Sequence, residues 1–233
     1  MTTAQVIVLA LVPVAYLIGS IPFGLIVGLT KGIDARKAGS GNIGATNLGR
    51  LLGGRYFALV FTLDMLKGML PMLAASFVLR GESRALATTD YLLWLGVGLA
   101  AILGHMFSVL LKFKGGKGVA TSAGVMLGVW PYFTGPGLVA IGAFVLIVLV
   151  TRYISLGSMG GAIVFPVAYV VIGRWRGWDV FGTQLPLLVF GALVAVLIVY
   201  KHRSNIARLV AGTEHKLGKK RPPPDPALTR PAA

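Results

Sequence analysis

The sequence has 233 residues, of which 56% are apolar and only 12% are charged, against about 25% charged in an average soluble domain. This composition argues against a soluble globular enzyme and against a disordered chain. The absence of cysteine excludes disulfides, thiolate metal sites and a cysteine nucleophile. The net charge of +15 indicates basic loops that face anionic lipid or an anionic substrate rather than nucleic acid, because the aromatic residues lie within the apolar runs.

Five apolar runs, residues 6–30, 56–79, 91–111, 153–172 and 180–200, are each long enough to cross roughly 30 Å of hydrocarbon. No Lys or Arg precedes the first run, so we interpret it as a retained helix and not as a signal peptide. The uncharged stretch 119–150 is too long for one straight pass. Pro131 and Gly135-Pro136-Gly137 predict a break near its middle, leaving either two short helices or one helix plus an irregular segment.

Counting Lys and Arg in the loops decides between these alternatives. With two helices in 119–150 the chain crosses seven times, and 17 basic residues lie on one side against 4 on the other. With one helix the counts are 10 and 11. The positive-inside rule therefore predicts an all-α membrane protein with seven transmembrane helices, its N-terminus outside and its C-terminus cytoplasmic. We expect residues 1–216 to form this domain, and residues 217–233, basic and rich in proline, to form a disordered cytoplasmic tail.

The first cytoplasmic loop is unusually polar between residues 39 and 50, where glycines alternate with Ser, Asn, Thr and Arg. Glycines let a backbone approach a ligand closely, and successive N–H groups in such turns bind anions. Arg50 can hold a phosphate with two hydrogen bonds. A flexible linker is the alternative, but the mixture of Asn47, Thr46 and Arg50 favours a binding loop.

The second cytoplasmic loop places Lys117 between Gly115-Gly116 and Gly118, directly before a predicted helix. Free N–H groups and the positive end of the helix dipole favour an anion at that point. The segment lacks the Ser or Thr after the lysine, and the first glycine, of a nucleotide-hydrolysing phosphate loop. It therefore predicts phosphate binding without nucleotide hydrolysis, whereas ordinary membrane-surface lysines remain an explanation for Lys112 and Lys114.

Charged and titratable side chains also occur inside or beside the apolar runs. Asp64 and Lys67 are three apart and can pair on one helix face, which favours a structural ion pair over a chemical role. His105, near the cytoplasmic end of the third run, either is a satisfied structural group or lines the site. His202 and Asn205, three apart beyond the last run, face the same way if the helix continues.

All the unusual segments, 39–50, 115–118, Ser155 and 202–214, fall on the cytoplasmic side of the seven-helix topology. Because the charge count did not use these motifs, their convergence independently supports a single site. Such a site is basic, lined by glycine and level with the membrane surface, and it suits an amphiphile with a phosphate head.

These residues together resemble the acyl-phosphate-dependent glycerol-3-phosphate acyltransferases, the PlsY family of bacterial membranes. The resemblance extends to about residue 217. It is carried by Gly19-Ser20-Ile21-Pro22-Phe23-Gly24, the run 39–50, Asp64-x-x-Lys67-Gly68, Gly104-His105 with 113–118, and His202-x-x-Asn205 with Gly212-Thr213-Glu214. It implies transfer of a fatty acyl group from acyl phosphate to position 1 of glycerol 3-phosphate, which gives lysophosphatidic acid and phosphate, the first step of phospholipid synthesis.

The resemblance also implies roles for particular residues. The residues expected to take part in catalysis are Ser40, Arg50, Lys117, His202 and Asn205. Those expected to bind substrate are Gly41, Asn42, Thr46, Asn47, His105, Gly115, Gly116, Gly118, Ser155 and Glu214. Glu214 is expected to support its loop rather than to touch substrate, and Ser158 is a competitor for the role of Ser155.

We expect no metal and no other cofactor, no nucleic-acid partner, and a monomer in the bacterial inner membrane with its active site on the cytoplasmic side. Two other classes of function remain open. A small transporter for an anionic solute would explain Asp64 and Lys67, although the polar residues gather on one side. A non-catalytic lipid-binding protein would tolerate Lys117→Arg, which keeps the charge but changes the geometry.

Overall fold

The computed structural model describes residues 1–81 and 85–218, and within these ranges its regular structure is helical. The predicted all-α class is therefore confirmed, while most of the predicted disordered tail (217–233) lies outside the described residues. The helices are α1 Thr3–Ser20, α2 Phe23–Leu29, α3 Ala45–Leu52, α4 Gly54–Arg80, α5 Thr88–Met106, the short 3-10 helix η1 Val109–Leu111, α6 Val119–Gly128, α7 Thr134–Thr151, α8 Ile154–Trp175, α9 Leu185–Lys201 and α10 Arg203–Val210.

Five segments of the described chain are long and apolar enough to cross a membrane: α1 with α2, α4, α5 with η1, α7 and α8. A sixth is present if α9 and α10, bent by 55° at their junction, count as one span. Helix α6 has 10 residues and is therefore about 15 Å long, about half the thickness of the hydrocarbon. Seven full passes, and the orientation of the termini, therefore stay predictions.

Three expected boundaries differ from the structure. The first run is not one helix, because the chain breaks at Ile21 and Pro22 between α1 and α2. The stretch 119–150 is broken near its middle, as expected, and forms two helices: α6 ends at Gly128, α7 begins at Thr134, and Pro131 lies between them. Gly135-Pro136-Gly137 is not part of this break. It lies in the first turn of α7, where a proline is tolerated because its missing N–H has no helical partner. The first polar loop is partly helical, since α3 contains Asn47 and Arg50.

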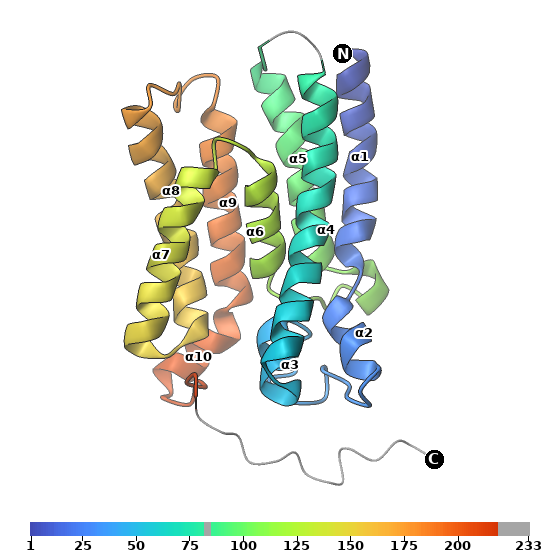
Figure 1. Cartoon of the computed structure of the whole chain (residues 1–233), viewed down its shortest axis with the longest axis vertical. Helices are drawn as coiled ribbons and strands as arrows, with labels where there is room; N and C mark the ends of the chain where they lie inside the picture. The colour runs from blue at the N-terminus through green and yellow to red at the C-terminus, as the bar shows by residue number, and fades with distance from the viewer. Residues whose placement is uncertain (82–84, 219–233) are drawn as a thin grey trace.

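Helix α5 lies at the centre of the bundle and contacts α1, α4, α6 and α9. Its inward residues Trp94, Val97 and Ile102 are fully buried. On the outside, large apolar side chains such as Ile141 and Leu149 of α7 are exposed, as a lipid-facing surface requires. Figure 1 shows α1, α4 and α5 side by side, with α7, α8 and α9 forming the other half and α6 between the two.

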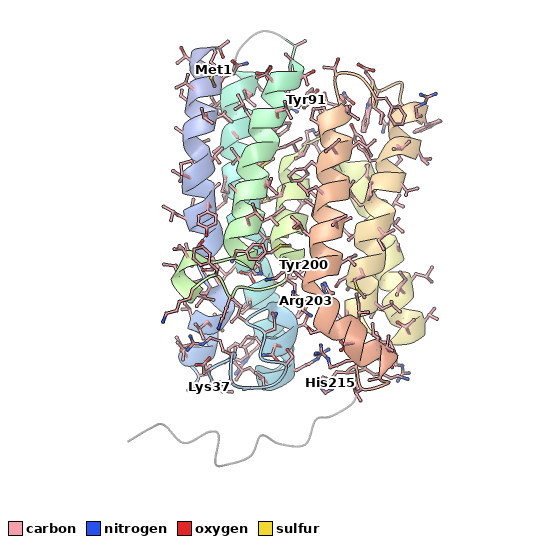
Figure 2. The ribbon with its side chains drawn as sticks, turned by 180° about the vertical axis from the view of Figure 1, so that it is seen from behind. Met1, Lys37, Tyr91, Tyr200, Arg203 and His215 are labelled. Carbon is pink, nitrogen blue, oxygen red and sulfur yellow. The ribbon has the colours of Figure 1, made fainter. Side chains whose placement is uncertain are left out.

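The short helices α2, α3 and α10 all lie at the end of the bundle opposite the N-terminus (Figure 1). We call this the site end. Figure 2 shows Lys37 and His215 at the site end, with Met1 and Tyr91 at the other. Helix α6 is packed backbone to backbone on α4. A Cβ on Gly68 would overlap the carbonyl oxygen of Thr121, and one on Gly124 that of Met65. This close packing fixes the depth at which α6, and Lys117 before it, begins.

Candidate active site

A cavity of about 120 Å³ is lined by the loop before α3, by helices α3 to α8, by the segment before α6 and by the chain around α10. It brings together 12 of the 15 residues expected at the site. These are Ser40, Asn42, Thr46, Asn47, Arg50, His105, Lys117, Gly118, Ser155, His202, Asn205 and Glu214. Gly41, Gly115 and Gly116 are not among the lining residues.

The polar loop before α3 is organised by the side chain of Asn47, which is 2% exposed. Its Nδ2 donates to the carbonyl oxygens of Ala35, Ala38 and Asn42 at 3.2, 3.1 and 2.8 Å. Its Oδ1 accepts from the N–H of Ser40 at 2.8 Å. Because these bonds occupy both ends of the amide, Asn47 shapes the loop around the cavity and has little capacity left for a ligand.

The glycines beside Lys117 pack against the end of α5. The N–H of Gly116 donates to the carbonyl oxygen of His105 at 3.0 Å, and a Cβ on Gly116 would overlap the His105 ring. Gly118 has φ +82° and lies against Met106, so a side chain there would be both strained and crowded. Only residues without a side chain allow the segment to pack this closely on α5. The Lys117 side chain, by contrast, points into the cavity.

Lys117 begins a hydrogen-bonded network that joins three parts of the chain. Its Nζ donates to Oδ1 of Asn205, and Nδ2 of Asn205 donates to Oε1 of Glu214 at 2.7 Å. The same Oε1 accepts from the Ser155 hydroxyl at 2.9 Å, and Oε2 accepts from Arg208 at 2.7 Å. Glu214 is thus held by three donors, while its role as a support rather than a substrate contact stays a prediction.

The chain after α10 is tied to the turn between α7 and α8. The N–H of Leu217 donates to the carbonyl oxygen of Arg152 at 2.7 Å, which places Glu214 over Ser155. The Ser158 hydroxyl also lies on the cavity wall, but it donates to the carbonyl oxygen of Ile154 in its own helix at 2.9 Å. Of the two candidate serines, Ser155 is therefore the one joined to the network.

The environment shifts the pKa values of two groups in this network. Burial lowers the pKa of Lys117 to about 8, against the opposing effect of the Glu214 charge. Burial also disfavours ionisation of Glu214, but the hydrogen bonds from Asn205, Arg208 and Ser155 outweigh it and keep the Glu214 pKa below its ordinary value. At neutral pH the cavity therefore presents a charged lysine, while the neighbouring carboxylate is already neutralised by Arg208.

His202 lies at the bend between α9 and α10 and is 2% exposed. Its Nδ1 is 2.8 Å from the carbonyl oxygen of Ile198. A carbonyl oxygen only accepts, so Nδ1 carries the proton and Nε2 of the neutral ring carries the lone pair. The bend, and not a continued straight helix, brings His202 and Asn205 to the same cavity.

Comparison with known proteins identifies the family. The model of the family described as Glycerol-3-phosphate acyltransferase matches residues 9–212. A protein named glycerol-3-phosphate acyltransferase from Trichlorobacter lovleyi is 47% identical over 87% of this chain and 93% of its own length. One of that name from Geobacter sulfurreducens is 45% identical over 89% and 96%. The chain belongs to the glycerol-3-phosphate acyltransferase family. It is therefore a bacterial membrane acyltransferase of phospholipid synthesis.

Two solved structures share its fold. The crystal structure of PlsY (YgiH), an integral membrane glycerol 3-phosphate acyltransferase, in its glycerol 3-phosphate form has a TM-score of 0.77 and 40% identity, covering 91% of this chain and 96% of that one. The lysophosphatidic acid form has a TM-score of 0.75 and 39% identity, covering 91% and 95%. The resemblance drawn from the sequence motifs is thus confirmed.

Part of the lining of the acyltransferase cavity is apolar, and no motif in the sequence marked it. Phe57 and Phe61 of α4 stack with their ring centres 5.7 Å apart. Phe144 of α7 and Ile154 at the start of α8 line the same cavity. The spacing of Phe57 and Phe61 matches one helix face, but lipid-facing residues have the same spacing. The sequence therefore carried no signal that distinguished these lining residues from the outer surface.

Proposed function

We propose that this acyltransferase uses acyl phosphate as donor, acylates position 1 of glycerol 3-phosphate, and releases lysophosphatidic acid and inorganic phosphate. The observation that carries the proposal is the cavity itself, because Lys117 and Arg50 line it together with Phe57, Phe61 and Phe144. The charged side chains suit two phosphate groups, and the aromatic side chains suit an acyl chain. The neighbouring structures, named for their glycerol 3-phosphate and lysophosphatidic acid forms, support the same acceptor and product.

We place the cavity on the cytoplasmic side, with the chain crossing the membrane seven times from an external N-terminus and acting as a monomer. The excess of basic residues on the loops at the site end supports this orientation. Glycerol 3-phosphate is a soluble anion and reaches a cavity at the membrane surface directly, whereas the acyl chain of the donor lies in the bilayer. A cavity that has both charged and aromatic lining residues at this level meets both requirements.

The reaction needs no covalent intermediate, because an acyl phosphate is a mixed anhydride and is already activated. The hydroxyl oxygen of glycerol 3-phosphate attacks the acyl carbon, the bond from that carbon to the phosphate oxygen breaks, and inorganic phosphate leaves. Lys117 and Arg50 offset the repulsion between the two anions. Holding the two reactants in line contributes up to about 7–11 kcal/mol in favourable systems.

The hydroxyl proton passes to the phosphate of the donor in this proposal, with His202 as the competing base. Nε2 of His202 holds a lone pair, as its bond to Ile198 requires. His202→Gln removes the titratable ring while keeping a polar side chain. Turnover that survives in this variant supports the donor phosphate as base. Lost turnover with unchanged glycerol 3-phosphate affinity assigns the proton transfer to His202.

The test of the function is phosphate release by the purified protein in lipid vesicles, supplied with palmitoyl phosphate with and without glycerol 3-phosphate. We expect release to require both compounds and lysophosphatidic acid to appear in equal amount. Lys117→Ala should abolish release, whereas Lys37→Ala, an exposed lysine at the same end of the molecule, should not. Activity with acyl-CoA but not with palmitoyl phosphate would overturn the donor assignment. Flux of glycerol 3-phosphate across the vesicles without acylation would favour a transporter.

A further inference from the structure

A chain of buried polar groups lies beneath the segment that carries Lys117. Asp64, Lys67 and His105 are 2%, 3% and 5% exposed. Nζ of Lys67 lies 2.7 Å from Oδ1 of Asp64 and donates to the carbonyl oxygen of Ile21 at 2.8 Å, at the break between α1 and α2. The same Asp64 oxygen lies 3.6 Å from Nδ1 of His105. Three helices are therefore joined at one point.

The opposite edge of the His105 ring faces the glycines before Lys117. A Cβ on Gly116 would overlap Nε2 of His105, and one on Gly115 would overlap the His105 carbonyl oxygen. That carbonyl also accepts from the N–H of Gly116 at 3.0 Å. The ring thus stands between Asp64 on one edge and the backbone of Gly116 on the other.

We propose that His105, packed beside the Asp64–Lys67 pair, is a positioning residue that sets the position and direction of the Gly115–Lys117 segment and so directs Lys117 at phosphate. The proposal rests on the phosphate-binding role of Lys117 in the proposed function. In this proposal Asp64 and Lys67 also help to position His105, in addition to forming an ion pair within one helix.

The ring of His105 lines the cavity and also packs on the segment before Lys117. Nε2 lies where a Cβ on Gly116 would overlap it, so the ring fills the space that the absent side chain of Gly116 leaves. An imidazole ring has two orientations related by a half turn about its χ2 bond. Nδ1 lies on the side of Asp64, and its separation of 3.6 Å from Oδ1 is too long for a hydrogen bond, so the Asp64 charge favours this orientation by electrostatic attraction. A ring kept in this orientation supports Gly115 and Gly116, which have no side chains with which to anchor the segment.

The inference is tested by a double-mutant cycle in the reconstituted protein with palmitoyl phosphate and glycerol 3-phosphate. Gly116→Ala pushes a methyl group against the His105 ring and should raise the KM for glycerol 3-phosphate about 10²-fold, the usual cost of a misplacement near 1 Å. In the His105→Ala background the same methyl group meets no ring, so the additional rise should be only about threefold. Gly142→Ala in α7, where a Cβ meets nothing within 4 Å, is the matched control.

A second readout distinguishes positioning from a loss of folded protein. Lys117 owes its lowered pKa first to burial, with Glu214 opposing and Arg208 and Arg50 adding to the effect. If the segment lifts in His105→Ala, Lys117 becomes more hydrated and its pKa moves towards 10.5. The fall of kcat/KM at alkaline pH should then begin at higher pH than in the unmodified protein. A lower folded fraction alone scales kcat and leaves this profile in place.

His105→Leu keeps the bulk of the ring and removes its polar edge, and should lie between the unmodified protein and His105→Ala in both readouts. Additive KM effects of Gly116→Ala and His105→Ala, or an unchanged alkaline profile in folded His105→Ala, overturn the inference. Lys117→Ala serves as the reference. Because it should abolish turnover, its affinity for glycerol 3-phosphate is measured by direct binding. If the Kd is unchanged, the proposed role of Lys117 fails, and that failure is distinguishable from failure of the His105 support.

Discussion

The two glycine-rich segments that reach the cavity are held in place in different ways. The segment before α3 is held from within, by the Asn47 amide that contacts four backbone groups of its own loop. The Gly115–Lys117 segment is held from outside, by the carbonyl oxygen and ring of His105 in α5. Two segments of similar composition are therefore fixed differently. The first is fixed by hydrogen bonds within its own loop, and the second by packing on helix α5.

The largest expected loss of kcat/KM comes from removing the Asn47 side chain, which holds the loop before α3. Asn47→Ala removes four hydrogen bonds, each contributing about 1 kcal/mol, so we expect kcat/KM for glycerol 3-phosphate to fall about 10²-fold or more. Trypsin should also cut faster at the exposed Lys37, since the loop loses its order. Asn42→Ala is the control, because it removes one bond to the N–H of Gly44 and should cost about fivefold. Equal losses of kcat/KM in both variants would show that the Asn47 side chain does not hold the loop in place.

A pH titration sharpens the comparison, because only the segment with Lys117 carries a cation that loses its proton near neutral pH. With a pKa of about 8, Lys117 is charged at pH 7 and largely neutral at pH 9. The kcat/KM for glycerol 3-phosphate should therefore fall about tenfold per pH unit above this pKa. Lys117→Arg stays charged throughout, so its activity, although lower, should not show this fall. An identical alkaline fall in the variant would assign it to another group.

The sequence predicted the membrane class, the family and most residues of the cavity, because charge asymmetry and local motifs depend on short stretches of chain. The breaks at Ile21–Pro22 and at His202 were not expected. Of the two segments expected to interrupt 119–150, Pro131 lies in the break between α6 and α7, whereas Pro136 is tolerated in the first turn of α7. The effect of a proline therefore depends on its place in the helix.

The site contains two features that motifs do not encode. The hydrogen bonds from the Asn47 amide to the backbone of its own loop are visible only in the folded structure. A motif does not distinguish an asparagine that holds a loop from one that contacts a ligand. That Phe57 and Phe61 of α4 line the same cavity as Phe144 of α7 is recognised only in the folded bundle. Both depend on tertiary neighbours and not on residue type.

The smallest expected loss of kcat/KM comes from Ser155, whose hydroxyl donates to Glu214 at the end of the Lys117 network. Ser155→Ala removes one of three donors to Glu214 and leaves Asn205 and Arg208 in place. Because one neutral hydrogen bond contributes about 1 kcal/mol, kcat/KM should fall about fivefold. The change in KM should be larger than that in kcat if Glu214 acts only through Asn205 and Lys117.

Ser158→Ala is the control. The Ser158 hydroxyl bonds to its own helix, so its loss should leave kcat/KM close to unchanged. A larger loss in Ser158→Ala than in Ser155→Ala would reverse the assignment of the two serines. A large fall in kcat alone in Ser155→Ala would place that hydroxyl at the reacting atoms, with Glu214 as its orienting partner.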